Sequence, residues 1–134
     1  MPGAQPTNTG FGRILVAVYA TFALAATARA GVQLATRFDE APLAYLLSAL
    51  SAVVYVVATI ALGRTGPTAR RVATYAVGFE LVGVLAIGTL SVLDPAAFPD
   101  QTVWSDYGQG YLFIPLALPL VGLWWLRRTS GRAD

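Results

Sequence analysis

Four long apolar segments dominate this sequence and restrict its fold more than any other feature. They cover residues 14–34, 43–62, 72–93 and 111–126, and the last extends back to Tyr107 if the preceding aromatic residues are included. A helix needs about 20 apolar residues to cross a lipid bilayer. Buried helices of a water-soluble protein would each keep a polar face, which these segments lack. The sequence therefore predicts an all-α bundle of four transmembrane helices, at about 13–36, 42–63, 71–93 and 107–127.

The composition agrees with a membrane protein and excludes several kinds of catalysis. Only 12% of the residues are charged, whereas soluble domains carry about 25%. The chain has no histidine and no cysteine, so it lacks the usual general base, thiol nucleophile and zinc ligands. We therefore expect no metal and no cofactor, while enzyme activity based on a carboxyl group stays open. The arginines are scattered rather than clustered, which argues against nucleic-acid binding.

The placement of the arginines predicts the orientation in the membrane, because cytoplasmic flanks carry most of the positive charge. Seven arginines flank the segments on the side of both termini: Arg13, Arg64, Arg70, Arg71, Arg127, Arg128 and Arg132. The opposite side has Arg37 and, near the end of the first segment, Arg29. We therefore expect a multi-pass protein of the cell (inner or plasma) membrane with both termini in the cytoplasm.

The regions outside the helices suggest a simple domain organisation. Residues 1–10 are expected to form a disordered cytoplasmic leader, residues 11–128 the transmembrane domain and residues 129–134 a short cytoplasmic tail. Trp104, in the last outer loop, is expected at the membrane surface, where aromatic side chains anchor helices. The stretch ATARAG resembles a signal-peptide cleavage site after Ala30, but the apolar run continues beyond it, which favours an uncleaved helix.

A carboxylate, Glu80, interrupts the third apolar segment in the stretch VGFELVGVLAIG. A charge near mid-bilayer costs about 2.5–3.5 kcal/mol, so this position needs a reason. At about 1.5 Å rise per residue, Glu80 lies about 13 Å from Arg71, close to the middle of the membrane. The same rise places Tyr55 and Tyr19 about 10 and 9 Å from the cytoplasmic ends of their helices. The three side chains are therefore predicted to form one polar layer.

Residues around this layer leave two interpretations of Glu80 open. Four polar residues of the second segment share one helical face: Ser48, Ser51, Tyr55 and Thr59. Small residues, Ala76 and Gly83, share the face of Glu80 and would let helices approach closely. Glu80 is either a neutral acid that bonds Tyr55 or Ser51 and joins the helices, or a carboxyl group that exchanges a proton or binds a ligand. In the second case Tyr55 and Tyr19 are its candidate catalytic partners.

A second polar group lies at the outer end of the first segment, where Arg29, Gln33 and Arg37 recur every four residues. One interpretation is an interfacial network in which these arginines reach headgroup level and pair with outer acidic residues such as Asp106. The alternative is a cleft that grips an anionic headgroup, because arginine binds phosphate with two parallel hydrogen bonds. The candidate ligand-binding residues are Arg29, Gln33, Arg37, Ser51 and Asp106.

Several segments resemble known families. The arginine-only basic residues and the outer segments RFDEAPLAY and VWSDYGQGY resemble small four-helix integral membrane proteins of high-GC actinobacteria, which have no assigned function. The stretch FELVGVLAIGT resembles the glutamate motif of small multidrug resistance transporters, although that family carries its glutamate on the first helix and this chain on the third. Size and topology are similar to polyprenyl-sugar flippases. The intramembrane acid is similar to that of membrane-embedded terpene cyclases.

Three functions are therefore open. The first is an accessory or lipid-binding subunit of a larger membrane complex, with a polar layer around Glu80. The second is a small transporter coupled through Glu80, which would need a homodimer or a larger assembly because one short bundle has little room for an aqueous path. The third is a membrane-embedded enzyme on a lipophilic, isoprenoid-like substrate, with Glu80 as general acid.

Overall fold

In the computed structural model, which describes residues 6–36, 39, 42–98 and 102–130, the chain is a bundle of helices. The long helices are α1 (Phe11–Thr36), α2 (Pro42–Gly63), α3 (Pro67–Leu93) and α4 (Ile114–Arg128). Two short 3-10 helices, η2 (Pro95–Ala97) and η3 (Ser105–Tyr111), precede α4. The described residues contain no strand, and the predicted all-α bundle is confirmed.

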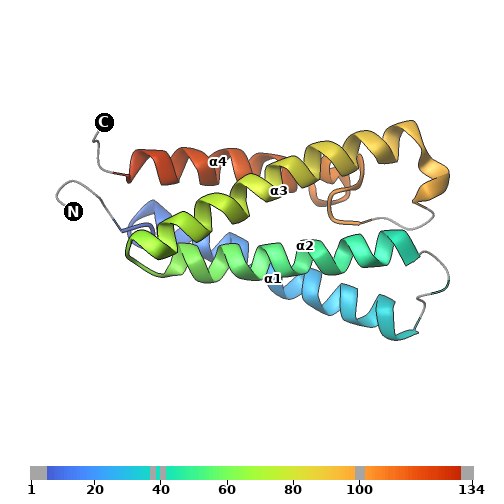
Figure 1. The fold of residues 1–134 in the computed structure, drawn as a ribbon, viewed down its shortest axis with the longest axis horizontal. Coiled ribbons are helices and arrows are strands. Elements are labelled where there is room, and N and C mark those ends of the chain that lie inside the picture. The colour runs from blue at the N-terminus through green and yellow to red at the C-terminus, as the bar shows by residue number, and fades with distance from the viewer. Residues whose placement is uncertain (1–5, 37–38, 40–41, 99–101, 131–134) are drawn as a thin grey trace.

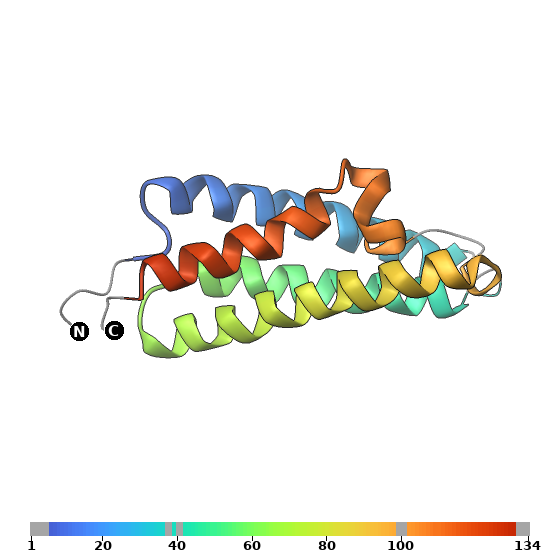
Figure 2. The ribbon, with the colours of Figure 1, turned by 90° about the horizontal axis from the view of Figure 1, so that it is seen from above.

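The long helices run side by side, and each lies next to its neighbours in the chain (Figures 1 and 2). α4 also closes against α1, where Phe11 packs edge-to-face on Trp124 and Trp125 at ring-centre distances of 5.9 and 5.3 Å. The start of α1, the turn between α2 and α3 and the end of α4 lie at one end of the bundle, which we call the termini end. The end of α1 and the segment after α3 lie at the opposite, loop end.

Three of the helices, α1, α2 and α3, are long and apolar enough to cross a membrane. η3 and α4 meet the same criterion together, but they are bent by 99° at the break between them. Large apolar side chains cover the outside of the bundle; Leu24 is 75% exposed and Leu93 76%. Such an apolar exterior is typical of a surface that faces lipid, so the helices have the character of membrane spans.

The fourth span differs in shape from the continuous helix predicted at 107–127. α4 has 15 residues and is therefore about 22 Å long, shorter than the hydrocarbon core of about 30 Å. The break falls at Leu112 and Phe113, whose φ angles of 60° lie in the left-handed region, which a right-handed helix cannot contain. η3 lies beyond the break on the loop-end side of α4 and stops short of the far ends of α2 and α3 (Figure 2).

The segment after α3 folds back into the bundle instead of lying on its surface. Trp104 is only 1% exposed, so its expected place at the membrane surface is wrong. The physical reason is that glycine at position 83 leaves space for the Trp104 ring, since a Cβ atom there would come within 2.6 Å of it. One turn and a half further along α3, Gly88 receives the ring of Tyr107 in the same way. The two glycines therefore let this segment pack closely against α3.

Hydrogen bonds hold the termini end together. Thr7 donates from Oγ1 to the Leu62 carbonyl at 2.6 Å, and its own carbonyl accepts from Trp125 Nε1 at 3.0 Å. Arg70 donates to the carbonyls of Leu126 and Thr129 at 2.9 and 3.0 Å. The described part of the expected leader therefore packs on the bundle, and Thr7 is buried. Residues 1–5 and 131–134 lie outside the described residues.

Candidate functional site

The centre of the bundle contains a buried hydrogen bond between two helices that are not neighbours in the chain. Tyr19 of α1 donates from its hydroxyl group to Glu80 Oε1 of α3 at 2.6 Å. Both side chains are 0% exposed. Tyr55 of α2 is equally buried, and its ring lies 6.1 Å from that of Tyr19. Helix rise predicted that Tyr19, Tyr55 and Glu80 lie at one depth, and the structure brings them together. Their catalytic role stays a prediction.

Three buried polar atoms beside this bond lack a hydrogen-bond partner among the described residues. They are Glu80 Oε2, the Tyr55 hydroxyl and Trp104 Nε1. The Tyr55 hydroxyl lies near both of the others without a hydrogen bond to either. A buried polar atom without a partner costs about 1–3 kcal/mol, so native structures contain few of them. Their gathering around one carboxyl group marks this place as a candidate site.

Small residues make room for the layer. Ala76 and Gly83 flank Glu80 on its face of α3, as the sequence predicted, and both are buried. A third small residue, Gly122 of α4, was not singled out from the sequence. A Cβ atom there would lie 3.1 Å from the Tyr19 hydroxyl, so α4 can pass close to the buried tyrosine. In the sequence, this glycine is visible between the two prolines and the two tryptophans of the fourth segment. Only the packing shows that it lies against Tyr19.

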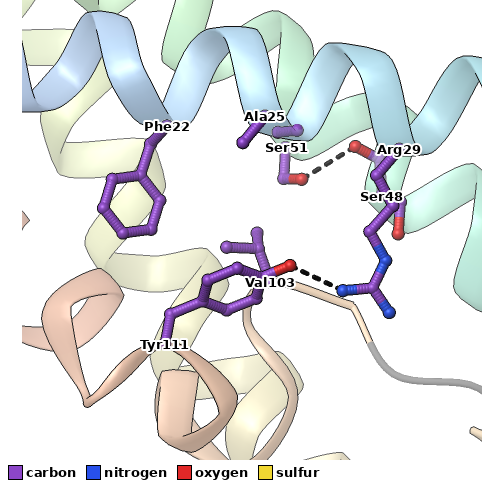
Figure 3. A pocket seen from close by; sticks show the side chains of 8 residues that line it. Phe22, Ala25, Arg29, Ser48, Ser51, Val103 and Tyr111 are labelled. Atoms are coloured by element: carbon purple, nitrogen blue, oxygen red, sulfur yellow. Dashed lines mark hydrogen bonds between the residues drawn. The ribbon is translucent and has the colours of Figure 1, made fainter.

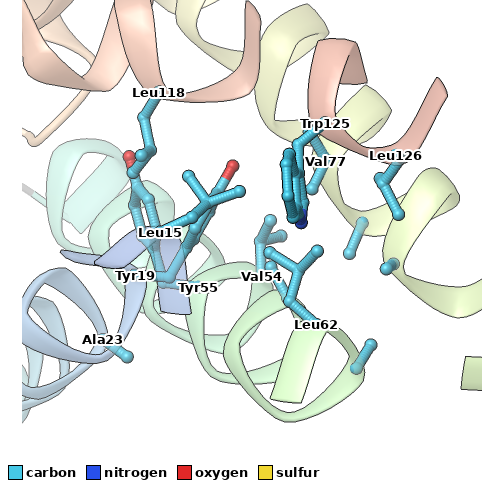
Figure 4. Close-up of a cluster of buried hydrophobic side chains, with 14 of the residues drawn as sticks. Leu15, Tyr19, Ala23, Val54, Tyr55, Leu62, Val77, Leu118, Trp125 and Leu126 are labelled. Atoms are coloured by element: carbon cyan, nitrogen blue, oxygen red, sulfur yellow. The ribbon is translucent and has the colours of Figure 1, made fainter. Parts of the chain in front are cut away.

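An apolar core separates the layer from the termini end. Its side chains come from all four long helices, and Figure 4 shows them beside Tyr19 and Tyr55: Leu15, Leu62, Val77, Trp125 and Leu126. Each is buried. On this side of the layer, Glu80 therefore faces closely packed apolar groups.

Towards the loop end, a small cavity lies next to Arg29, between α1, α2 and the segment before α4 (Figure 3). Its volume is about 10 Å³, which suits about one water molecule. Arg29 Nη1 donates to the Tyr111 hydroxyl at 2.6 Å, and both residues line the cavity. Ser48 and Ser51 contribute hydroxyl groups to the wall. Ser51 donates to the Ser48 carbonyl at 2.8 Å, whereas Ser48 Oγ has no partner among the described residues.

The other predicted ligand-binding residues are placed differently. Gln33 is 2% exposed, and its Oε1 lacks a described partner. Arg37 lies outside the described residues. Asp106 accepts a weak hydrogen bond from Ser91, whose Oγ also accepts from the Asp106 amide at 2.8 Å. Asp106 lines a separate cavity of about 410 Å³ with Ser91 and Phe98. The structure therefore brings Arg29 and Ser51 together and places Asp106 elsewhere.

Within the described part of the chain, no three histidine, cysteine, aspartate or glutamate side chains gather to hold a metal ion. Comparison with protein families, with characterised proteins and with solved structures finds no match to this chain. The resemblances noted from the sequence stay predictions. What the chain can do is therefore argued from the geometry of its two polar sites.

Proposed function

We propose that this chain is an accessory, lipid-binding membrane protein that holds an anionic headgroup at Arg29. The observation that carries the proposal is the position of Arg29, half-buried beside a cavity with serine hydroxyl groups and fixed by Tyr111. A guanidinium group offers paired donors to a phosphate, and Arg29 is partly exposed beside the cavity. These are the groups that recognise a phospholipid headgroup.

The size of the cavity limits how a lipid binds. At about 10 Å³ it admits about one water molecule, so the headgroup lies over its mouth and not inside it. Apolar side chains close in sequence to Arg29 and Tyr111 are exposed and therefore open to acyl chains; Val32 is 57% exposed, Leu112 84% and Phe113 48%. A charged group beside exposed apolar side chains fits a phospholipid better than a free anion.

The arrangement of the arginines supports an outer-leaflet site. The flanking arginines of α1, α2, α3 and α4 belong to helix ends that lie together at the termini end (Figure 1). Since positive flanks stay in the cytoplasm, we place the termini end there and the loop end, with Arg29, on the outer side of the cell membrane. Homodimers or larger membrane complexes are the assemblies in which such an accessory protein would act.

The closed environment of Glu80 supports an accessory role over a substrate passage. Glu80 is 0% exposed and bonded to Tyr19. It lines neither of the two cavities described above. A tunnel for an isoprenoid chain would bring an apolar cavity to the carboxyl group.

Retention of an anionic phospholipid tests the proposal. The protein is purified in detergent with phosphatidylglycerol, and bound lipid is measured by native mass spectrometry. We expect Arg29→Gln to lose most of the bound lipid and Arg29→Lys, which keeps the charge but not the paired donors, to lose part of it. Arg71→Gln is the matched control, because Arg71 is exposed at the termini end. Equal retention by Arg29→Gln and the unchanged protein would overturn the proposal.

A second function is favoured by one observation, a Glu80 Oε2 atom without a partner among the described residues, in a carboxyl group that lies near Tyr55. A free carboxyl oxygen in this position suits a coupling group of a transporter or a general acid of a membrane enzyme. Glu80→Gln keeps the shape and cannot ionise. If transport of a cationic dye or cyclisation of an isoprenoid is found and is lost in Glu80→Gln with the fold intact, this second function replaces the first.

A further inference from the structure

Polar side chains continue from the Arg29 cavity to Glu80 along one face of α2. Ser48 and Ser51 line the cavity, and Tyr55 lies one turn beyond Ser51 on the same face. The Tyr55 hydroxyl lies near Glu80 and Trp104 but makes no hydrogen bond to either in the structure. The cavity and the buried carboxyl group are therefore joined by residues that can form hydrogen bonds.

One aromatic ring stands between the cavity and this layer. Phe22 lines the cavity, and its ring is stacked on Tyr55 at a ring-centre distance of 5.8 Å. The same ring contacts Tyr111, also at 5.8 Å, with its edge. Figure 3 shows Phe22 on the side of the cavity away from the Arg29 guanidinium group, and Tyr111 between them with its hydroxyl group directed at Arg29. Phe22 is only partly buried, so rotation of its side chain would connect the cavity with Tyr55.

Towards the termini end, buried apolar side chains close off the polar layer. Leu15 precedes Tyr19 by one turn of α1 and is 3% exposed, and Leu62 and Trp125 close the core below it. The hydrogen bonds of Thr7 and Arg70 then hold that end of the bundle together. Polar groups of α2 thus lead from the layer towards the loop end, beside apolar ones such as Val84, whereas the side chains named towards the termini end are apolar.

The groups that face Glu80 come from each element packed around it. The titratable ones are Tyr19 of α1 and Tyr55 of α2. Trp104 contributes an indole N–H group, and α4 contributes Gly122 at this level. The tyrosine hydroxyl groups are able both to donate and to accept a hydrogen bond, as a proton relay requires.

From this geometry we infer that Glu80 is a proton-binding site that exchanges with the loop end only, past Phe22 and through Tyr55. A water molecule in the cavity gives a proton to the Tyr55 oxygen, and Tyr55 passes its own proton to Glu80 Oε2. The carboxylate becomes a neutral acid, Tyr55 is regenerated, and the water is left as hydroxide, or as water if it began as hydronium. This inference does not depend on lipid binding at Arg29.

Infrared spectroscopy of the protein in lipid membranes tests the site. A neutral carboxyl group gives its own carbonyl band, which Glu80→Gln must abolish if the band belongs to Glu80. Transfer into D₂O then shifts the band at the rate at which the proton exchanges. Absence of any band that Glu80→Gln removes would overturn the inference, because Glu80 would then hold no proton.

Two truncations on opposite sides of the layer test the direction of access. Both residues are on α1: Phe22→Ala opens the loop-end side, and Leu15→Ala opens the termini-end side. We expect Phe22→Ala to speed exchange by about tenfold, equivalent to a barrier lower by about 1.4 kcal/mol, and Leu15→Ala to leave the rate unchanged. Equal acceleration by Leu15→Ala would overturn one-sided access.

Two conservative substitutions test the proton relay even if either truncated variant fails to fold. Tyr55→Phe removes the proposed relay hydroxyl group and should slow exchange several-fold. Tyr19→Phe removes the hydrogen bond to Oε1 and should shift the carbonyl band without slowing exchange. Unchanged exchange in Tyr55→Phe would overturn the proposed route.

Discussion

Tyr19 of α1 and Glu80 of α3 are joined by a hydrogen bond of 2.6 Å in the interior of the bundle. The two helices are separated in the chain by the whole of α2, so this bond links the first helix to the third. Inside a membrane, polar contacts of this kind hold helices together, because lipid gives no hydrophobic force between them.

Tyr19→Phe removes this link and leaves a buried carboxyl oxygen without its donor. We expect a loss of about 1 kcal/mol in the free energy of unfolding, measured by denaturant titration in mixed micelles. The matched control is Tyr75→Phe on α3, since Tyr75 is 72% exposed and should change stability little. Equal effects of the two substitutions would show that the Tyr19 bond does not stabilise the bundle.

Gly83→Ala tests the insertion of Trp104. The added methyl group would lie 2.6 Å from the indole, so Trp104 has to move, and crowding of this kind costs about 1–3 kcal/mol. Gly78→Ala, on the same helix, is the control, because nothing lies within 4 Å of the added atom there. Alanine should even stabilise the helix at that position by up to about 1 kcal/mol. Tryptophan fluorescence would report movement of the indole in the first variant only.

The sequence predicts the helices and the polar layer for simple physical reasons. Long apolar segments have few alternatives in a bilayer, and a fixed rise per residue places Tyr19, Tyr55 and Glu80 at one depth. For the hydrogen-bond partner of Glu80, the sequence predicts Tyr55 or Ser51. The structure shows Tyr19 in that place instead. Depth alone does not decide which side chain points at the acid.

The fold of the segment before α4 is harder to predict. Tyr107, Leu112 and Phe113 adopt left-handed φ angles, which bulky residues rarely do, so local preferences argue against the observed bend. Tryptophan is a residue type that usually anchors helices at the membrane surface. Only the packing of Trp104 on Gly83 shows that its side chain lies inside the bundle. Such tertiary contacts leave no periodic pattern in the sequence.

Arg70→Gln should loosen the end of α4. Arg70 donates to the carbonyls of Leu126 and Thr129 and to the Thr129 hydroxyl, and these groups close the last turn of that helix. Because Arg70 is only partly buried, we expect a loss of about 1 kcal/mol. Hydrogen exchange of the amides near Thr129 should rise. Arg71→Gln, at an exposed neighbouring position, is the control and should leave that exchange unchanged.

Both proposals depend on a bundle that crosses the membrane, and the lipid site depends also on a loop end that lies outside. The chain has no cysteine, so single cysteines can be introduced at exposed positions of the two ends, Gln109→Cys and Ser130→Cys. The decisive measurement is labelling of intact cells with a membrane-impermeant maleimide. We predict that Gln109→Cys is labelled from outside and that Ser130→Cys is labelled only after the cells are opened. Labelling of Ser130→Cys in intact cells, with Gln109→Cys protected, would contradict the orientation and with it the outer-leaflet lipid site.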